Sequence, residues 1–313
     1  MKRLILYLLL LSGIMQPMQA HSQDKANKFR VIGYFYNKWG KAEDIQYKYL
    51  TAINYCFATI SPGDGLIKED FDKEKLKAVV KKAKANGVDV LLAIGGPNES
   101  PHFKWFVKKP GAIKNFVKSA MQLIQKYDLA GVDIDWEYPD LKDSSAQRFT
   151  ILLKELSAAL KPAGKTLSVA VAARGEKADC IEQAVFDYVD YFNIMAYDNN
   201  LKYNTSHSTY TMANNSLNYW LGNRNLPAQK AVLGVPSYGR TAKTGKAVFY
   251  KDLLKKGAKA DQDEWDNVHY NGLSTIARKA KLARQRGGGV AMWELNLDGK
   301  GDNSLLKAMY ENR

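Results

Sequence analysis

The chain has 313 residues, of which 46% are hydrophobic, and this size and composition exclude global disorder and allow one large α/β domain or two smaller ones. Its net charge of +14 comes mostly from lysines on helix-like segments such as residues 73–84, where no aromatic residues are interleaved, so nucleic-acid binding is not expected. The two cysteines, Cys56 and Cys180, are too few for a disulfide framework and are interpreted as packing residues.

The first 20 residues are predicted to be an export signal. Lys2 and Arg3 supply its positive start, and residues 4–15 supply an apolar stretch that is too short for a spanning helix of about 20 residues. Ala20 is the expected last residue before cleavage, although Met18 fits the small-residue rule poorly, and a retained membrane anchor is the alternative. The prediction is a signal over 1–20, a short segment over 21–28 and a single folded domain over 29–313. The processed protein is expected to be secreted or periplasmic, without stable membrane insertion.

The remaining chain alternates apolar, β-branched runs with amphipathic stretches. Strands are predicted over residues 30–36, 52–60, 89–94, 131–137, 167–172, 191–196, 231–235 and 289–293. Helices are predicted over residues 73–85, 113–127, 146–160, 181–185, 212–221, 273–286 and 305–311, with weaker helical segments over 43–49 and 251–256. Eight strand–helix units favour an α/β fold with a closed (β/α)8 (TIM) barrel. An open doubly wound sheet is the alternative, but the first strand is not followed by the Gly-rich loop typical of its nucleotide site.

Three acids, Asp133, Asp135 and Glu137, occupy every second position of the fourth predicted strand. Side chains two residues apart share one face of a strand, so the three carboxylates are expected on one side and the apolar residues between them on the other. Carboxylates this close repel each other, which favours a site where one acid keeps a proton near neutral pH. Glu137 lies at the carboxyl end of the strand, where barrels of this type carry catalytic groups. A hydrogen-bonded cluster without turnover is the alternative.

Segments on six predicted strands carry, in order, the motifs of one family. Residues 130–137 match its strand-four signature Asp-Gly-x-Asp-x-Asp-x-Glu except at Ala130. The other matches are Ile-Gly-Tyr at 32–34, Ile-Asn-Tyr-Cys-Phe-Ala at 53–58, Ile-Gly-Gly at 94–96, Asn-Ile-Met-Ala-Tyr-Asp at 193–198 and Trp293. On these motifs the chain resembles glycoside hydrolase family 18, which contains chitinases, endo-β-N-acetylglucosaminidases and chitinase-like lectins.

The resemblance implies a retaining, substrate-assisted mechanism that needs neither a metal nor another cofactor. Glu137 would protonate the leaving glycosidic oxygen and later activate water. Asp135 would hold the acetamido N–H of the substrate, Asp133 would supply the charge behind Asp135, and Tyr197 would donate to the acetamido oxygen. The residues expected to contact the sugar are Tyr34, Phe57, Tyr138, Met195, Asp198 and Trp293. Plain core packing is the alternative for the aromatic and methionine side chains among them. The four histidines show no ligand spacing and are expected at the surface.

The predicted function is that of a secreted, endo-acting chitinase-like hydrolase that acts as a monomer on β-1,4-linked N-acetylglucosamine polymers or oligomers. The alternatives are an endo-β-N-acetylglucosaminidase that cuts the chitobiose core of N-glycans, a peptidoglycan hydrolase, and a non-catalytic chitin- or glycan-binding lectin. Such lectins typically lack the terminal glutamate, so the presence of Glu137 counts against the last alternative.

The chain departs from the family at four places. Ala130 replaces the first aspartate of the signature, on the face opposite the acids. Ala93 replaces a serine expected to support Asp133 beside Tyr34, so a changed proton distribution between the inner acids is expected. Pro97 replaces a common tryptophan. Residues 241–288 are too few for the α+β insertion domain common in larger chitinases, and this predicts a shallow, open groove.

Overall fold

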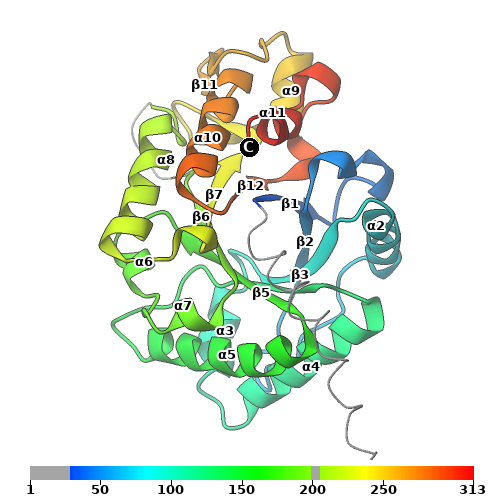
Figure 1. Cartoon of the computed structure of the whole chain (residues 1–313), viewed down its shortest axis with the longest axis vertical. Coiled ribbons are helices and arrows are strands. Elements are labelled where there is room, and N and C mark those ends of the chain that lie inside the picture. The colour runs from blue at the N-terminus through cyan, green and yellow to red at the C-terminus, as the bar shows by residue number, and fades with distance from the viewer. Residues whose placement is uncertain (1–28, 199–204) are drawn as a thin grey trace, which may run out of the picture.

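Eight apolar, β-branched runs form the strands of one closed barrel. A computed structural model describes residues 29–198 and 205–313. The barrel strands, all paired in parallel, are β1 (Arg30–Tyr36), β2 (Ala52–Ala58), β3 (Asp89–Gly95), β4 (Gly131–Asp135), β5 (Thr166–Ala172), β6 (Tyr191–Met195), β7 (Ala231–Pro236) and β12 (Gly289–Trp293). Because β1 pairs with both β2 and β12, the sheet closes on itself. The predicted (β/α)8 barrel is confirmed, and the open doubly wound sheet is excluded (Figure 1).

Helices surround the barrel and join successive strands (Figure 1). They are α2 (Lys73–Ala85), α3 (Ser100–Phe106), α4 (Ala112–Tyr127), α5 (Ser145–Leu160), α6 (Glu176–Asp179), α7 (Val185–Tyr188), α8 (Tyr210–Leu217), α9 (Tyr250–Lys255), α10 (Leu273–Arg286) and α11 (Leu305–Glu311). The helix predicted over residues 181–185 is wrong. Ile181 and Val185 are both buried, which produced the helical spacing, but the chain turns between them and forms the short helices α6 and α7 on either side.

Two apolar layers follow from the alternation along each strand. One lies between strands and helices and contains Val132, Ile134 and Trp136, while a smaller cluster fills the inside of the barrel. Asp133 and Asp135 are buried and belong to the opposite, inward face of β4, as predicted from the two-residue period. β4 itself ends at Asp135, two residues earlier than predicted.

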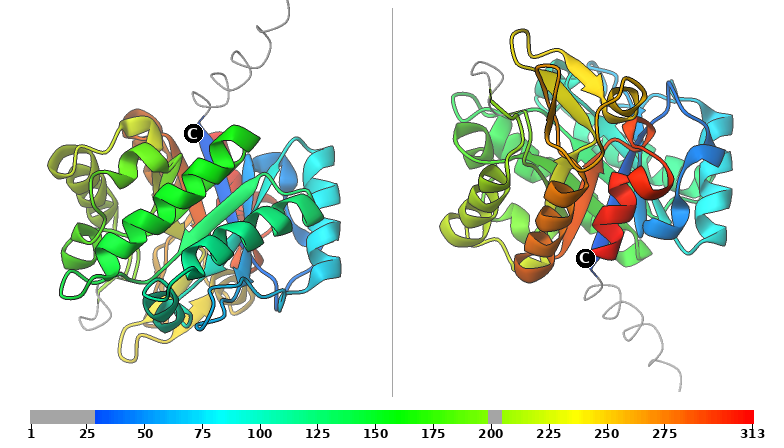
Figure 2. Two further views of the ribbon diagram at one scale, coloured as in Figure 1. Left: turned by 90° about the horizontal axis from the view of Figure 1, so that it is seen from below. Right: turned by 90° about the horizontal axis from the view of Figure 1, so that it is seen from above.

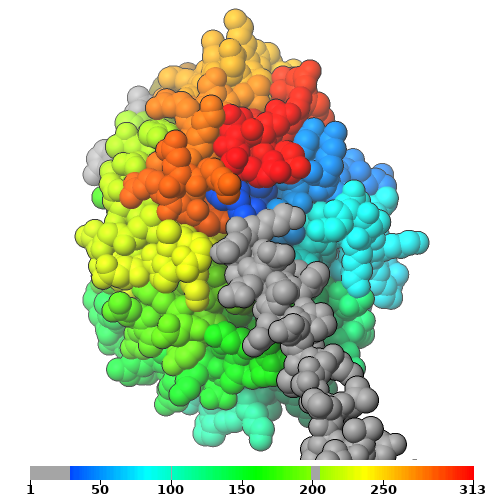
Figure 3. Space-filling model, in the orientation of Figure 1, coloured from blue at the N-terminus to red at the C-terminus, as the bar shows by residue number. Residues whose placement is uncertain are grey.

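The two ends of the barrel differ. Helices α10 and α11 pack against each other beside the start of β1, at the end that faces the viewer in Figures 1 and 3. At the opposite end a small antiparallel sheet projects (Figure 2). Its strands are β8 (Tyr238–Thr241), β9 (Ala247–Phe249), β10 (Glu264–Trp265) and β11 (Val268–His269).

The small sheet and α9 lie in the segment between β7 and α10, which was predicted to be too short for an insertion domain. Their buried residues Tyr250, Leu253 and Val268 belong to the main apolar core and form no core of their own. The segment is therefore an extension of the barrel, in agreement with the predicted absence of an insertion domain.

Cys56 and Cys180 are buried and unpaired, as packing residues would be. Within residues 29–198 and 205–313, no helix has the length and apolarity needed to cross a membrane. The predicted export signal and the segment over 21–28 lie outside the described residues.

Candidate active site

A cavity of about 620 Å³ opens at the carboxyl ends of the barrel strands. Its lining comes from segments far apart in the sequence, including the ends of β1, β2, β4 and β6, the residues that follow β3 and β12, and the small sheet. The volume lies in the range of small-ligand sites, and the position is the one where barrels of this class place their chemistry. Of the residues predicted to act in catalysis or to contact the sugar, Asp135, Glu137, Tyr197, Tyr34, Phe57, Met195, Asp198 and Trp293 line this cavity. Asp133 lies beneath it, and Tyr138 lies outside its lining.

Asp133 is the innermost acid, and three donors satisfy its carboxylate. Tyr34 Oη donates to Oδ2 over 3.0 Å, and Oδ1 accepts from Ser168 Oγ and from Asn193 Nδ2, the latter over 3.0 Å. Burial raises the pKa of Asp133 to about 6, although the three hydrogen bonds oppose the rise because they favour the charged form. Asp133 therefore keeps its proton to a higher pH than an exposed aspartate does.

The strand register explains how Asp133 is supported although Ala93 lacks a hydroxyl. In the barrel, Asp133 aligns with Ala93 of β3 on one side and with Ser168 of β5 on the other. A serine at either flanking position can reach the same carboxylate. Ser168 therefore supplies from β5 the hydrogen bond that was expected to be missing on β3.

Replacing Ser168 by alanine is expected to move the acidic limb of the pH–rate profile upward by about 0.5–1 pH unit. The substitution removes a hydrogen bond to the charged form, which is worth roughly 1 kcal/mol, so the pKa of Asp133 rises and its charge is lost at a higher pH. The measurement is kcat/KM against pH on a soluble N-acetylglucosamine oligomer, the substrate that the family resemblance implies. Adding Ala93→Ser to Ser168→Ala restores a hydroxyl from the other strand and is expected to return the limb toward its original pH. An unshifted limb in Ser168→Ala would contradict this account.

Asp135 and Glu137 form a hydrogen-bonded pair above Asp133. Asp135 is 3% exposed at the end of β4, and Glu137 follows it, partly exposed, in the cavity. Burial, the neighbouring charges of Glu137 and Asp133, and the hydrogen bond with Glu137 raise the pKa of Asp135 well above its usual range. Burial also raises the pKa of Glu137, against hydrogen bonds from Tyr138 and Asp135 and the charge of Lys177. Because ionising both groups would put two charges side by side, the second proton of the pair leaves at a higher pH than the first.

Asp198 follows Tyr197 beyond β6 and joins the barrel to the small sheet. Arg240 binds its two oxygens with Nε and Nη2 over 2.9 and 2.6 Å, and Tyr238 Oη donates over 2.7 Å. Burial alone would raise the pKa of Asp198, but hydrogen bonds from His207 and Arg240 hold it below its usual range. Asp198 is thus a charged anchor for this wall of the cavity.

His207 was expected at the surface, and this prediction is wrong. The side chain is 1% exposed, with Nδ1 2.9 Å from Asp198 Oδ1 and Nε2 3.2 Å from the carbonyl oxygen of Tyr238. Both ring nitrogens therefore lie within hydrogen-bond distance of a polar partner. The sequence contains no local signal for this role, because the partners lie 9 and 31 positions away.

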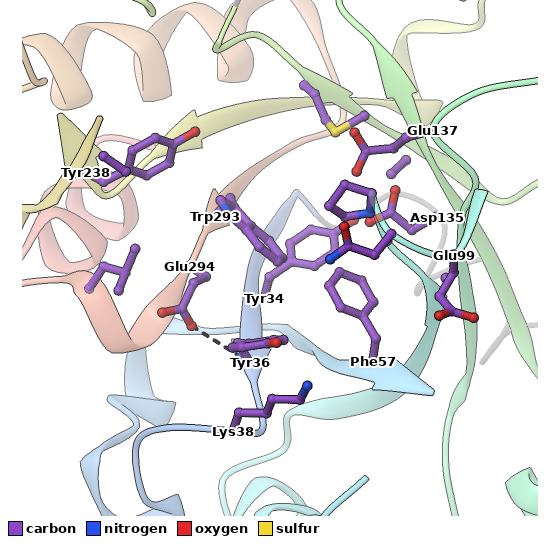
Figure 4. Close-up of a pocket in the computed structure, with 18 of the residues that line it drawn as sticks. Tyr34, Tyr36, Lys38, Phe57, Glu99, Asp135, Glu137, Tyr238, Trp293 and Glu294 are labelled. Carbon is purple, nitrogen blue, oxygen red and sulfur yellow. Dashed lines mark hydrogen bonds between the residues drawn. The ribbon is translucent and has the colours of Figure 1, made fainter. Parts of the chain in front are cut away.

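A continuous group of aromatic rings forms the floor of the cavity (Figure 4). Trp293 makes an edge contact with Tyr34 at 5.5 Å between centroids and stacks on Phe57 at 5.7 Å. In Figure 4 these rings lie between Glu294 on one side and Asp135 and Glu137 on the other. Flat apolar faces next to acids suit a sugar ring, which has apolar C–H faces and polar edges.

The lining residues that the sequence did not predict include Trp39, Glu99, Phe249 and Glu294. Glu294 is 1% exposed and accepts from Tyr36 N, Trp39 Nε1 and the backbone and side-chain nitrogens of Asn296. Trp39 and Glu294 each lie within three residues of the carboxyl end of a barrel strand. Because barrels of this class carry their site residues at these ends, this position in the sequence could have identified both residues. Tyr138 is hydrogen-bonded to Glu137, and Lys177 Nζ lies 4.7 Å from its ring centroid. Within the described ranges, no group of three or more His, Cys, Asp or Glu residues is placed to hold a metal ion.

Comparison with known proteins identifies similar chains. Residues 30–298 match the family described as glycosyl hydrolases family 18. Probable chitinase 10 of Drosophila melanogaster is 31% identical over 265 residues, which cover 73% of this chain and 12% of that protein. The structure is similar to a family 18 chitinase from the chitin utilization locus of Flavobacterium johnsoniae, with a TM-score of 0.80 and 27% identity over 91% of this chain and 94% of that one. It is also similar to a chitinase from Bacteroides thetaiotaomicron, with a TM-score of 0.83 and 26% identity over 91% and 96% of the two chains. The matched regions span 12% to 66% of the length of the first three curated relatives.

Proposed function

Because this chain belongs to the glycosyl hydrolases of family 18, we propose that it hydrolyses β-1,4-linked N-acetylglucosamine polymers or oligomers by a retaining, substrate-assisted mechanism. The observation that supports the proposal is the column of Asp133, Asp135 and Glu137 beside the aromatic floor of a cavity of about 620 Å³. Glu137 is the general acid, since it combines a raised pKa with a place in the cavity.

The arrangement of carboxylates supports attack by the substrate's own acetamido group. Enzymes that use two carboxylates place them about 5–9.5 Å apart, on either side of the scissile bond. Here Asp135 and Glu137 are hydrogen-bonded to each other, so they act from one side. Asp198, the next cavity carboxylate, is held by Arg240 and Tyr238 and is not placed as a nucleophile.

Asp135 then has the role of orienting the acetamido group. Its Oδ1 atom is buried and has no hydrogen-bond partner in the described part of the chain, which leaves it available to accept from the acetamido N–H. When the oxazolinium-like intermediate forms, the charge of Asp135 stabilises the developing positive charge. Tyr197, which also lines the cavity, supports the acetamido oxygen.

The charge of the cavity favours a neutral glycan, although the whole chain carries +14. Six carboxylate side chains and two cationic ones line the described cavity, and the cationic ones are Lys38 and Arg240. Like charges in a cleft disfavour a polyanionic substrate. Chitin oligomers and the chitobiose core of N-glycans fit this condition better than peptidoglycan with its carboxylate substituents.

Trp39→Ala is expected to raise KM about 3- to 10-fold for oligomers of four or more sugars and to leave kcat within about twofold. Trp39 is 45% exposed at the cavity edge, with Phe249 5.6 Å and Tyr36 5.1 Å away between ring centroids, so it offers a face to a sugar beyond the reacting one. An aromatic contact is worth about 0.5–1.5 kcal/mol. The measurement is KM against oligomer length, with Trp105→Ala as control, since Trp105 is 56% exposed and lies outside the cavity lining. An equal effect of both substitutions would contradict the assignment of Trp39.

The experiment that tests the function is a product profile on chitin oligomers, an N-glycan-bearing glycoprotein and peptidoglycan, with NMR detection of the anomer first formed. Cleavage of chitin oligomers with release of the β-anomer supports the proposal. Release of N-glycans with intact oligomers identifies the endo-β-N-acetylglucosaminidase alternative. Tight oligomer binding without product identifies the lectin alternative. We further propose that the enzyme is exported by residues 1–20 and acts as a monomer with endo preference.

A further inference from the structure

Lys279 is a charged residue in the apolar interior, away from the cavity. It lies on α10, is 0% exposed, and its ammonium group uses all three of its hydrogens. Nζ donates to the carbonyl oxygen of Ser208 and to Ser208 Oγ, both over 2.8 Å, and to Asn271 Oδ1 over 2.6 Å. All three acceptors are neutral.

A buried ammonium group held only by neutral acceptors costs stability. The charged group that faces Lys279 is Asp263, whose carboxylate already accepts from the backbone of Gly272 and from Thr275 Oγ1. Burial lowers the pKa of Lys279 to about 7, and Asp263 opposes this shift only in part. Packing alone would favour an apolar side chain of the same length at this place. Lys279 therefore calls for an explanation other than stability.

The partners of Lys279 lead to the active site. Ser208 Oγ, which accepts from Lys279, donates to the carbonyl oxygen of Ala196 over 2.7 Å. Ala196 precedes Tyr197, and His207, which precedes Ser208, holds Asp198. Asn271 Nδ2 adds a second bond to the carbonyl oxygen of Ser208 over 2.9 Å. Helix α10 packs against α8, which begins just after Ser208, so the ammonium group reaches this point from a rigid element (Figure 1).

We propose that Lys279 is a positioning residue for the reaction, because it fixes Ser208 against Ala196 and thereby sets Tyr197 and Asp198 at the cavity. This inference rests on the proposed function, in which Tyr197 supports the acetamido group and Asp198 anchors the adjoining wall. Lys279 is not among the residues that line the cavity, and it acts through its bonds to Ser208. The loss of folding free energy caused by burying the charge of Lys279 is offset by a better ordered active site.

The test is Lys279→Met, with Lys281→Met as the matched control at an exposed position of the same helix. In Lys279→Met, kcat on a chitin oligomer is expected to fall about 10- to 100-fold, the effect of a misplaced reacting group, while KM stays within about threefold. Tm is expected to remain unchanged or to rise, because the desolvated charge is gone. Lys281→Met should retain both kcat and Tm. A wild-type kcat in Lys279→Met overturns the proposal.

Ser208→Ala removes the Oγ atom that joins Lys279 to Ala196 and leaves Lys279 and its bond to the carbonyl oxygen of Ser208 in place. It is expected to lower kcat as well, and the double variant should be no slower than Lys279→Met alone, because both changes remove one connection. If the Tm of Lys279→Met is lower than that of the wild type, the kcat and Tm of Ser208→Ala decide whether Lys279 positions the active site. A reduced kcat at unchanged Tm supports the proposal, and an unchanged kcat overturns it.

Hydrogen exchange separates this inference from the proposed function. The amides of Ala196, Tyr197 and Asp198 are expected to exchange faster in Lys279→Met than in wild type and Lys281→Met, with or without turnover. If wild-type protein cleaves no oligomer, the proposed function fails, and the exchange rates still decide the role of Lys279. Unchanged exchange at these amides overturns it.

Discussion

Glu137→Gln is expected to lower kcat on a soluble chitin oligomer by at least about 10³-fold, with little change in KM. A glutamine amide has nearly the same shape as the acid but has no proton to give to the leaving oxygen and cannot later take one from water, and a positioned acid–base group contributes about 10²–10⁴-fold in a single step. Glu137 is the group that the fold prepares for this task, because it lines the cavity and burial raises its pKa even though the hydrogen bond with Asp135 opposes the rise. The measurement is the steady-state rate with wild type and variant at the pH optimum of each.

The matched control for Glu137→Gln is Glu99→Gln. Glu99 also lines the cavity, but its carboxylate is held by Ile60 N and His102 and has no link to the acid column. The same chemical change there is expected to alter kcat less than about tenfold, because it removes no proton-transfer group. Turnover by Glu137→Gln within tenfold of wild type would refute the assignment of the general acid and with it the hydrolase proposal.

Asp135→Asn is expected to lower kcat about 10²–10³-fold and to move the basic limb of the pH–rate profile toward lower pH. The rate falls because the charge that stabilises the positively charged intermediate is lost, an effect of the size seen when one preorganised electrostatic contact is removed. The limb moves because the last proton of the wild-type pair leaves only when a second charge forms beside the first. With a neutral amide at position 135 this repulsion is absent, so Glu137 loses its proton at a pH lower by at least about one unit.

The two readouts of Asp135→Asn test separate statements. The pH profile of kcat/KM reports the last proton of the pair, and kcat at the optimum reports the contact with the acetamido group. Asp70→Asn is the control, since Asp70 lines the same cavity but binds Thr59 and not the acid column. A basic limb that stays in place would show that Asp135 and Glu137 titrate independently.

Much of the barrel could be predicted because strand and helix periods are local. The bounds of β1, β12, α2, α10 and α11 agree with the predicted ranges residue by residue. The errors arose where tertiary contacts decide the structure. α3 was missed, and the short strands of the small sheet were missed because two to four residues carry no period of their own.

Lys279 fits the apolar stripe of its helix, but its charge was predicted to lie on a solvated face. The positive charge of the chain was interpreted as belonging to solvated helix faces. Position 279, however, is three residues after Ile276 and four before Ala283, both buried, and so falls in the apolar stripe of α10. The pattern thus predicted where Lys279 lies, but its partners Ser208 and Asn271 could be known only from the packed helices.

The sequence by itself determined that Asp133, Asp135 and Glu137 share one face at the carboxyl end of a barrel strand, because side-chain direction along a strand depends only on neighbouring backbone geometry. The tertiary structure decided what supports and tunes them. Tyr34, Ser168 and Asn193 reach Asp133 from 99, 35 and 60 positions away, and this is set by barrel closure and strand register. For this reason the missing hydroxyl at Ala93 was visible in the sequence, whereas its replacement by Ser168 was not.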